Sequence, residues 1–161
     1  MTKKQAFTEV IKENQGIIFK ITSVYTNNKE DQQDLYQEIV YQLFKSYKTF
    51  KGNAKISTWM YRVALNTSIT YLKKEKRGGV RIPIEKILTY KTEQEDTIIE
   101  DRIVLLHTKI KKLNIIEKGI ILLYLEGKNY DEIAEITGFT NTNVGTRLSR
   151  IKEKLKTQIL K

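Results

Sequence analysis

The stretch NYDEIAEITGFTNTNVGTRLSRIKEKLK, residues 129–156, predicts two helices that meet at a tight turn. Asn129 stands three residues before Glu132, a variant of the capping box, so we expect the first helix to begin at Tyr130. Gly138 can adopt the left-handed backbone conformation that such a turn needs. The spacing is therefore that of a helix-turn-helix.

The second helix of this pair has one apolar face. Thr140 is a suitable N-cap, and Phe139 before it can fill the angle between the two helices. The small side chain of Ala134 lets the helices cross closely, with Ile133 and Ile136 beside it. Steps of four, three and four residues predict a buried stripe of Val144, Leu148, Ile151 and Leu155.

The opposite face of this helix carries amide, hydroxyl and basic side chains. Amides and guanidinium groups in the N-terminal half of such a helix can make bidentate contacts with adenine and guanine, while basic groups farther along suit phosphates. Gly145 lowers the helix propensity by about 1 kcal/mol relative to Ala. A plain helical hairpin with a solvated polar face is the alternative. We expect DNA binding through Asn143, Thr146, Arg147, Arg150 and Lys154.

The composition agrees with a nucleic-acid partner. The chain carries 29 Lys+Arg against 19 Asp+Glu, and its net charge of +10 would attract a polyanion, with an anionic membrane surface as the second candidate. Because there is no Cys and a single His, His107, thiolate metal sites, disulfides and Cys/His catalysis are excluded. We assign His107 no role, and expect no cofactor and no metal.

No apolar run approaches the roughly 20 residues that span a bilayer. We therefore expect a cytoplasmic protein without membrane insertion.

The rest of the chain is also helical in pattern. Apolar residues recur at three- and four-residue steps over 7–24, where Gly16 can bend the helix, and helices follow at about 32–47 and 56–76. Glycines at 78 and 79, Pro83 and the acidic stretch TEQEDTIIED then change the composition as a linker would, apart from a weak strand pattern in VRIPI. The expected fold is all-α: a helical domain over 1–77, a flexible linker over 78–102 and a helix-turn-helix domain over 103–161.

The segment DLYQEIVYQLF, residues 34–44, predicts a helix with an acidic outer face. Leu35, Ile39 and Leu43 point inward, so an acidic and amide face remains on a basic protein, which suggests a positively charged protein partner. This outer face consists of Asp34, Gln37, Glu38 and Tyr41.

The segment ISTWMYRVALNTSITYLKKEKR, residues 56–77, predicts two stripes on one helix. Stacking on an aromatic ring contributes about 1 to 3 kcal/mol per exposed base, so the more polar stripe could bind unpaired DNA. Alternatively, Trp59 is a core residue and the basic residues form a solvated helix end. The buried stripe is Ile56, Met60, Val63, Ala64, Thr67 and Tyr71, and the polar stripe is Trp59, Arg62, Asn66, Lys73 and Arg77.

In order and spacing, these segments resemble an extracytoplasmic-function (ECF) sigma factor of bacterial RNA polymerase over nearly the whole chain. The resemblance implies that Asp34, Gln37 and Glu38 dock on the β′ clamp helices of core polymerase, which also contributes its β subunit. It implies that the loop SYKTFKGNAK and the helix after it, with Trp59, Arg62 and Asn66, melt and capture the minus-ten promoter element, and that Asn143, Thr146, Arg147 and Arg150 read the minus-thirty-five element as duplex.

The resemblance also implies an initiation factor that has no catalytic chemistry, and a regulatory anti-sigma factor, often membrane-bound. The chain departs from the family pattern at Thr70, where an acidic residue is frequent, and at Gly145, where Lys is common.

Two other functions fit parts of the sequence. An autonomous helix-turn-helix regulator would use the first domain for dimerisation or sensing, and would bind duplex DNA without polymerase. A metal-dependent nuclease would use the carboxylates of TEQEDTIIED, although a solvated charge run in a linker is the simpler interpretation.

Overall fold

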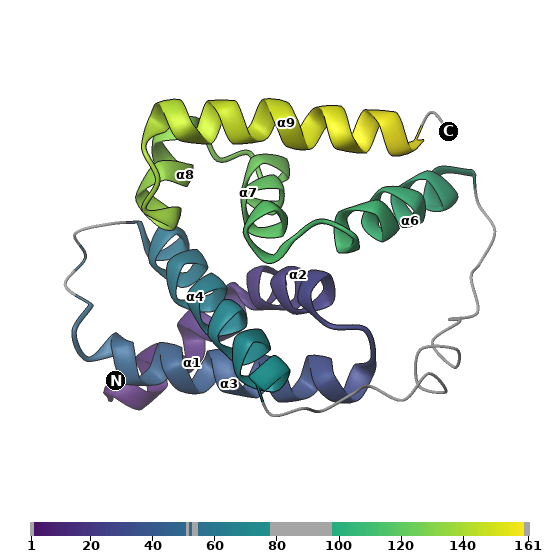
Figure 1. Ribbon diagram of the computed structural model, residues 1–161. Helices are drawn as coiled ribbons and strands as arrows, with labels where there is room; N and C mark the ends of the chain where they lie inside the picture. Colours follow the sequence, from purple (N-terminus) through teal and green to yellow (C-terminus); the bar gives the residue numbers. More distant parts are fainter. Residues whose placement is uncertain (1, 51, 53–54, 78–97, 160–161) are drawn as a thin grey trace. The chain divides into compact units, whose positions relative to one another are not determined.

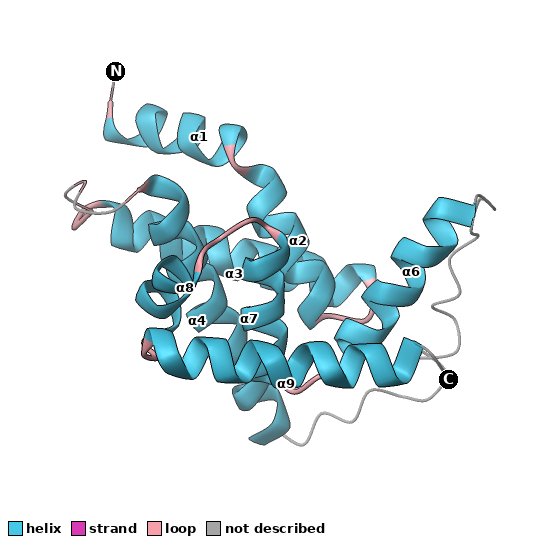
Figure 2. Cartoon of the chain, turned by 90° about the horizontal axis from the view of Figure 1, so that it is seen from above, coloured by secondary structure: helices cyan, strands magenta, loops and turns pink. Residues whose placement is uncertain are grey.

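The computed structural model describes residues 2–50, 52, 55–77 and 98–159. Among these residues the regular secondary structure is helix alone, as the sequence predicts. Figure 2 shows the helices joined by short loops. The chain divides into two compact units, Met1–Ile87 and Leu88–Lys161. The predicted strand pattern VRIPI and most of the predicted linker lie outside the described residues.

The first unit begins with α1 (Lys3–Glu13) and α2 (Gln15–Tyr25). The apolar period over 7–24 is thus divided at Asn14 and not at Gly16, which lies inside α2. Asn14 leaves helical geometry at φ −123° and ψ 21°, and its Nδ2 donates to the carbonyl oxygen of Val10 at 2.8 Å. An Asn side chain that bonds the backbone in this way competes with helix continuation.

Helices α3 (Lys29–Tyr47) and α4 (Ile56–Arg77) complete the first unit. α3 begins earlier than the sequence predicts, because Asn28 is its N-cap and accepts from the backbone N–H of Asp31 at 2.8 Å. The acidic first turn of α3 also interacts favourably with the helix dipole.

Helices α2, α3 and α4 pack against one another, and α1 packs on α3 (Figure 1). The three predicted inward positions of α3 are fully buried. α4 buries a wider face than its predicted stripe, because it contacts both α2 and α3. Of that stripe Met60 and Ala64 are buried, and they are joined by Thr58, Trp59, Tyr61, Leu65 and Ser68.

The second unit contains α6 (Ile98–Lys111), α7 (Ile115–Leu125), α8 (Tyr130–Thr137) and α9 (Asn141–Ile159). α6 begins before residue 103, so the last part of the acidic stretch is helical. α9 packs against α6, α7 and α8, which lie on one side of it (Figure 1).

Within the described part of the chain, no helix is both long enough and apolar enough to cross a membrane.

Candidate nucleic-acid interface

Helix α8 and the turn that follows it have the predicted construction. The side chain of Asn129 accepts from the backbone N–H of Glu132 at 2.8 Å, and the Glu132 carboxylate accepts from the N–H of Asn129 at 3.2 Å, which confirms the capping box. Gly138 has φ +85° and its N–H donates to the carbonyl oxygen of Ala134 at 2.8 Å, so the left-handed conformation is also confirmed.

The start of α9 is fixed by side chains on both sides of the turn. The Thr140 hydroxyl accepts from the backbone N–H of Asn143 at 3.1 Å. Nδ2 of Asn141 donates to a carboxylate oxygen of Asp131, which joins the first turns of α9 and α8. The predicted apolar stripe of α9 is buried, and it consists of Val144, Leu148, Ile151 and Leu155. The opposite face of α9 therefore points to solvent.

The side chain of Arg147 is held in place on the outer face of α9. Its Nε donates to Oδ1 of Asn143 at 2.6 Å, and its guanidinium carbon lies 4.3 Å from the ring centroid of Phe139. Asn143, Thr146 and Arg150 are exposed, whereas Arg147 is half-buried against these partners. The sequence predicts Phe139 only as a filler between helices, since its contact with Arg147 spans the turn and has no local signature.

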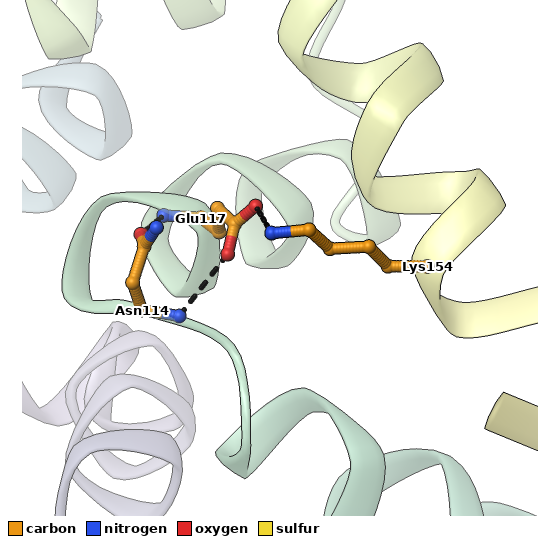
Figure 3. Close-up of polar contacts among 3 residues, drawn as sticks. All are labelled: Asn114, Glu117 and Lys154. Atoms are coloured by element: carbon orange, nitrogen blue, oxygen red, sulfur yellow. Dashed lines mark hydrogen bonds and ion pairs between the residues drawn. The ribbon is translucent and has the colours of Figure 1, made fainter.

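Lys154 takes part in an ion pair that the sequence does not predict. Its Nζ lies 2.6 Å from Oε2 of Glu117, and Figure 3 shows the lysine reaching from α9 to the start of α7. Glu117 is only 8% exposed, and its other oxygen accepts from the backbone N–H of Asn114 at 3.2 Å. A buried carboxylate requires such partners. The geometry therefore favours a structural role for Lys154 over the predicted phosphate contact.

Asn114 and Glu117 have the same three-residue spacing as Asn129 and Glu132, so the sequence could have predicted this capping box as well. The sequence could not have predicted the lysine partner of Glu117, because Lys154 lies 37 residues farther along the chain.

Gly145 is explained by its neighbour on α8. A Cβ atom at this position would lie 3.3 Å from Cε2 and 3.7 Å from Cδ2 of Tyr130. The ring of Tyr130 thus packs close to the backbone of α9, which a glycine accommodates without displacement.

The aromatic part of the polar stripe on α4 is not an open platform. Trp59 is 8% exposed, and the ring of Phe50 stacks on it with centroids 4.8 Å apart, while Tyr47 lies at 6.0 Å. An unpaired base would have to displace Phe50 to stack there. The structure therefore supports the alternative that Trp59 is a core residue.

The other members of this stripe differ in exposure. Asn66 and Lys73 are exposed on α4, and Arg62 is half-buried. Arg77 is the last residue of α4, but its side chain is outside the described part of the chain.

The predicted outer face of α3 is present on the surface. Asp34 and Gln37 are exposed, and Glu38 is half-buried, where it accepts from Nε2 of Gln42 at 3.1 Å. Tyr41 is 54% exposed, and Nζ of Lys45 lies 5.2 Å from its ring centroid. The face is therefore acidic at its N-terminal end and carries an aromatic ring and a cation farther along.

Both units match families of known proteins. Residues 10–78 match Sigma-70 region 2, and residues 103–155 match Sigma-70, region 4. The RNA polymerase sigma factor SigV of Bacillus subtilis is 27% identical over 161 residues, which cover 99% of this chain and 95% of that protein. The ECF RNA polymerase sigma-E factor of Haemophilus influenzae is 28% identical and covers 97% and 88%, respectively. The chain belongs to the ECF sigma factors of the sigma-70 family.

Solved structures show the same fold for this sigma factor. The sigma factor RpoE from Bartonella quintana, crystallised with the anti-sigma factor NepR, aligns with a TM-score of 0.69 at 17% identity and covers 97% of this chain and 95% of that one. CnrH in complex with the cytosolic domain of CnrY also gives 0.69, at 15% identity and with 98% and 89% coverage.

The family assigns the function of the chain. As a sigma factor it directs promoter-specific transcription by RNA polymerase, and the autonomous regulator is not favoured because both units match sigma regions. The carboxylates of the nuclease alternative lie in a stretch whose side chains are outside the described residues. Among the residues that are described, no three acidic, His or Cys side chains gather as a metal site would need.

His107 and Lys152 are among the side chains of the sigma factor's second unit that have a shifted pKa. Burial, and then the nearby Lys111, lower the pKa of His107 on α6, which keeps the imidazole neutral at pH 7. A hydrogen bond with Tyr124 raises the pKa of Lys152 on α9, where Nζ lies 4.1 Å from the Tyr124 ring centroid. His107 therefore adds no positive charge for DNA at neutral pH, and Lys152 remains a cation.

Proposed function

We propose that the two units of this sigma factor divide promoter recognition between them. The first unit docks on core polymerase and captures the opened minus-ten element, and the second reads the minus-thirty-five element as duplex. The observation that carries this proposal is the match of two sigma regions, in order, to two units that each have their own buried core.

The polymerase contact is proposed for the outer face of α3. Asp34, Gln37, Glu38 and Tyr41 lie along one side of this helix, where acidic and amide groups suit a basic partner surface. In this proposal the partner is the pair of β′ clamp helices, with further contacts from the β subunit. The sigma factor acts where polymerase acts, in the cytoplasm.

Capture of the minus-ten element is proposed for α4 and the loop before it. The exposed Asn66 and Lys73, with Arg62 and Arg77, supply donors and positive charge for an unpaired strand. We propose that Trp59 contacts no base and instead packs under Phe50 in the core that carries this site, because Phe50 covers its ring.

Duplex reading is proposed for the outer face of α9. Asn143, Thr146 and Arg147 lie in its first two turns, where a recognition helix meets base edges. For the exposed Arg150, farther along the helix, we propose a phosphate contact. Lys154 is left out of this set because its ammonium is paired with Glu117.

Neither unit needs to bind tightly alone. Two linked sites act as one binding event with a high effective concentration, so contacts at both promoter elements can offset the cost of unpairing a few base pairs. The proposal requires no catalytic residue, metal or cofactor. We also propose an anti-sigma factor as a regulatory partner, a class of partner seen with the related RpoE fold.

Reconstituted transcription tests the proposal. The chain is combined with core polymerase from the same bacterium, and transcript starts are mapped on genomic DNA fragments. We expect initiation at a limited set of sites with shared upstream and minus-ten sequences. Absence of specific initiation on any fragment would contradict the proposal. Tight duplex binding by the chain alone, with a salt slope of about −0.9 per phosphate contacted, would support the autonomous regulator instead.

A further inference from the structure

Asn143 and Arg147 are one helical turn apart on the outer face of α9, and the sequence alone treats them as two separate base readers. The structure joins them. Nε of Arg147 donates to Oδ1 of Asn143 at 2.6 Å, and Phe139 lies under the guanidinium at 4.3 Å. The three side chains therefore form one arrangement that spans the turn and the first two turns of α9.

The amide of Asn143 is committed to this arrangement. Bidentate recognition of adenine requires the amide oxygen to accept from the base and the amide nitrogen to donate to it. The oxygen of Asn143 already accepts from a guanidinium, and such a charge-assisted bond is roughly twice as strong as a neutral one. The Asn143 oxygen keeps a second lone pair, but this bond fixes the orientation of the amide relative to Arg147. Any contact of Asn143 with a base therefore depends on the position of the arginine.

The guanidinium of Arg147 has one edge left for DNA. Phe139 covers one of its faces and Asn143 occupies Nε, which leaves the two terminal nitrogens, Nη1 and Nη2. These nitrogens only donate hydrogen bonds. Guanine presents two acceptors, O6 and N7, in the major groove, whereas adenine presents one acceptor and one donor. A fork that only donates therefore matches guanine.

The same contacts restrict the motion of the side chain before DNA arrives. Ordering a long side chain on binding lowers affinity, and a side chain that is already ordered avoids most of this loss. The side chain of Arg147 is thus already ordered for contact with one base. Arg150, farther along α9, is exposed and suits a contact with the DNA phosphate backbone.

We infer that Arg147 is the specificity-determining residue of α9, that it reads a guanine in the upstream promoter element, and that Asn143 and Phe139 are positioning residues for it. The inference rests on the proposed function, because it takes α9 as the helix that enters the major groove.

The test measures base discrimination rather than affinity alone. The sigma factor is bound to core polymerase on a promoter mapped as above, and each base pair of the upstream element is replaced in turn. For the unaltered chain we expect one guanine whose replacement weakens binding roughly 5- to 150-fold. Arg147→Ala should abolish this discrimination, and Asn143→Ala and Phe139→Leu should each reduce it while discrimination at other positions remains.

Asn143→Asp separates positioning from direct reading. Aspartate keeps an oxygen acceptor for Nε of Arg147 but lacks the amide donor that adenine N7 needs. We expect it to retain the guanine discrimination, although its negative charge lowers the affinity for all sequences. Ser149→Ala, an exposed change on the same helix, is the matched control and should leave discrimination unchanged.

Two results would overturn this inference and leave the proposed function intact. The first is an adenine preference that both Asn143→Ala and Asn143→Asp remove while the guanine preference persists. The second is guanine discrimination that survives Arg147→Ala. If the unaltered chain with polymerase showed no base preference anywhere in the upstream element, the proposed function of the second unit would fail as well, so the two failures are distinguishable.

Discussion

Trp59 shows how burial changes the role of a single residue. Its ring is covered by Phe50 and lies near Tyr47, so it belongs to the aromatic end of the first unit's core. A base-stacking tryptophan would need an open face. The arrangement therefore favours a supporting role for Trp59 beside Phe50, and leaves the proposed DNA contacts to the exposed polar groups along α4.

Replacing Trp59 should therefore affect folding before it affects DNA. Trp59→Ala is expected to lower the free energy of unfolding of the first unit by about 3 to 5 kcal/mol, the usual loss for a buried large aromatic residue. Trp59→Phe keeps an aromatic ring against Phe50 and should retain most of the stability and of promoter opening. Urea unfolding followed by circular dichroism, with permanganate footprinting of the open complex, checks both variants. An alanine variant as stable as the original chain that still fails to open promoters would indicate base stacking instead.

Gly145 is the second residue whose role depends on a neighbour from another helix. Alanine in a helix is favoured over glycine by about 1 kcal/mol. Against this gain, the added Cβ would lie 3.3 Å from the ring of Tyr130, which is 38% exposed and free to shift by a few tenths of an ångström. Gly145→Ala should thus stabilise the second unit by less than the full propensity gain.

A double-mutant cycle tests this explanation of Gly145. In a Tyr130→Ala background the ring is gone, so Gly145→Ala should stabilise the second unit by the full amount, about 1 kcal/mol. Circular dichroism in urea follows both units, while the fluorescence of the single tryptophan reports the first unit and serves as an internal control. Equal effects of Gly145→Ala in both backgrounds would show that Tyr130 is irrelevant to it.

At the scale of elements, the ion pair of Glu117 and Lys154 braces α9, the proposed recognition helix. The carboxylate caps the start of α7 and also holds the lysine of α9, so one buried group fixes two helices (Figure 3). The position of α9 relative to α7 therefore depends on a polar contact as well as on the apolar stripe.

The brace predicts how Lys154 behaves in DNA binding. Lys154→Gln should leave the salt dependence of promoter binding unchanged, whereas Arg150→Gln should reduce the slope by about 0.9 for one lost phosphate contact. Binding constants measured over a series of salt concentrations distinguish the two. A slope that falls equally in both variants would place Lys154 on a phosphate.

The same substitution should destabilise the second unit. Lys154→Gln leaves the Glu117 carboxylate without its cation, and we expect a loss of about 1 to 3 kcal/mol in the free energy of unfolding. Adding Glu117→Gln removes the unpaired charge but keeps an oxygen for the N–H of Asn114, so the double variant should recover part of the loss. Urea unfolding by circular dichroism measures this recovery, and a double variant less stable than Lys154→Gln alone would argue against the brace.

Helix α3 carries the prediction for polymerase binding. Asp34→Lys reverses the charge of an exposed group on its outer face and should weaken binding to core polymerase on the order of tenfold. Glu13→Lys makes the same change of charge at an exposed position of α1 and is the matched control. Titration of labelled sigma factor with core polymerase compares them. Equal weakening by both variants would mean that only the net charge matters.

At the scale of the whole molecule, the two units fold around separate cores and are joined by one chain. Under the proposed function, their covalent connection contributes to binding, because it makes the second promoter contact intramolecular once the first has formed.

Cutting that connection should abolish promoter selection without unfolding either unit. Fragments 1–87 and 88–161 mixed in equal amounts are expected to lose roughly 10²- to 10⁴-fold in specific initiation relative to the intact chain at the same concentration. Transcription from a mapped promoter measures the loss, and circular dichroism of each fragment confirms that it is folded. Full activity of the mixture would show that the two units need no tether.

The sequence by itself determined the features that depend on near neighbours. The capping box at Asn129, the left-handed Gly138, the buried stripe of α9 and the outer face of α3 all follow from residues within a few positions of one another, since helix period and cap chemistry are local. The ordered pair of motifs was also enough to indicate the family. Local patterns, however, do not say which side chain of one helix meets which side chain of another.

The tertiary structure alone decided the contacts between elements. It placed Phe50 over Trp59, Glu117 against Lys154, and the ring of Tyr130 at Gly145. It also set Phe139 beneath Arg147, which is the basis for proposing one base reader with two positioning residues in place of two separate readers. Each of these pairs joins side chains from different elements and so depends on how the cores pack, and the burial that results determines which polar and aromatic groups remain exposed.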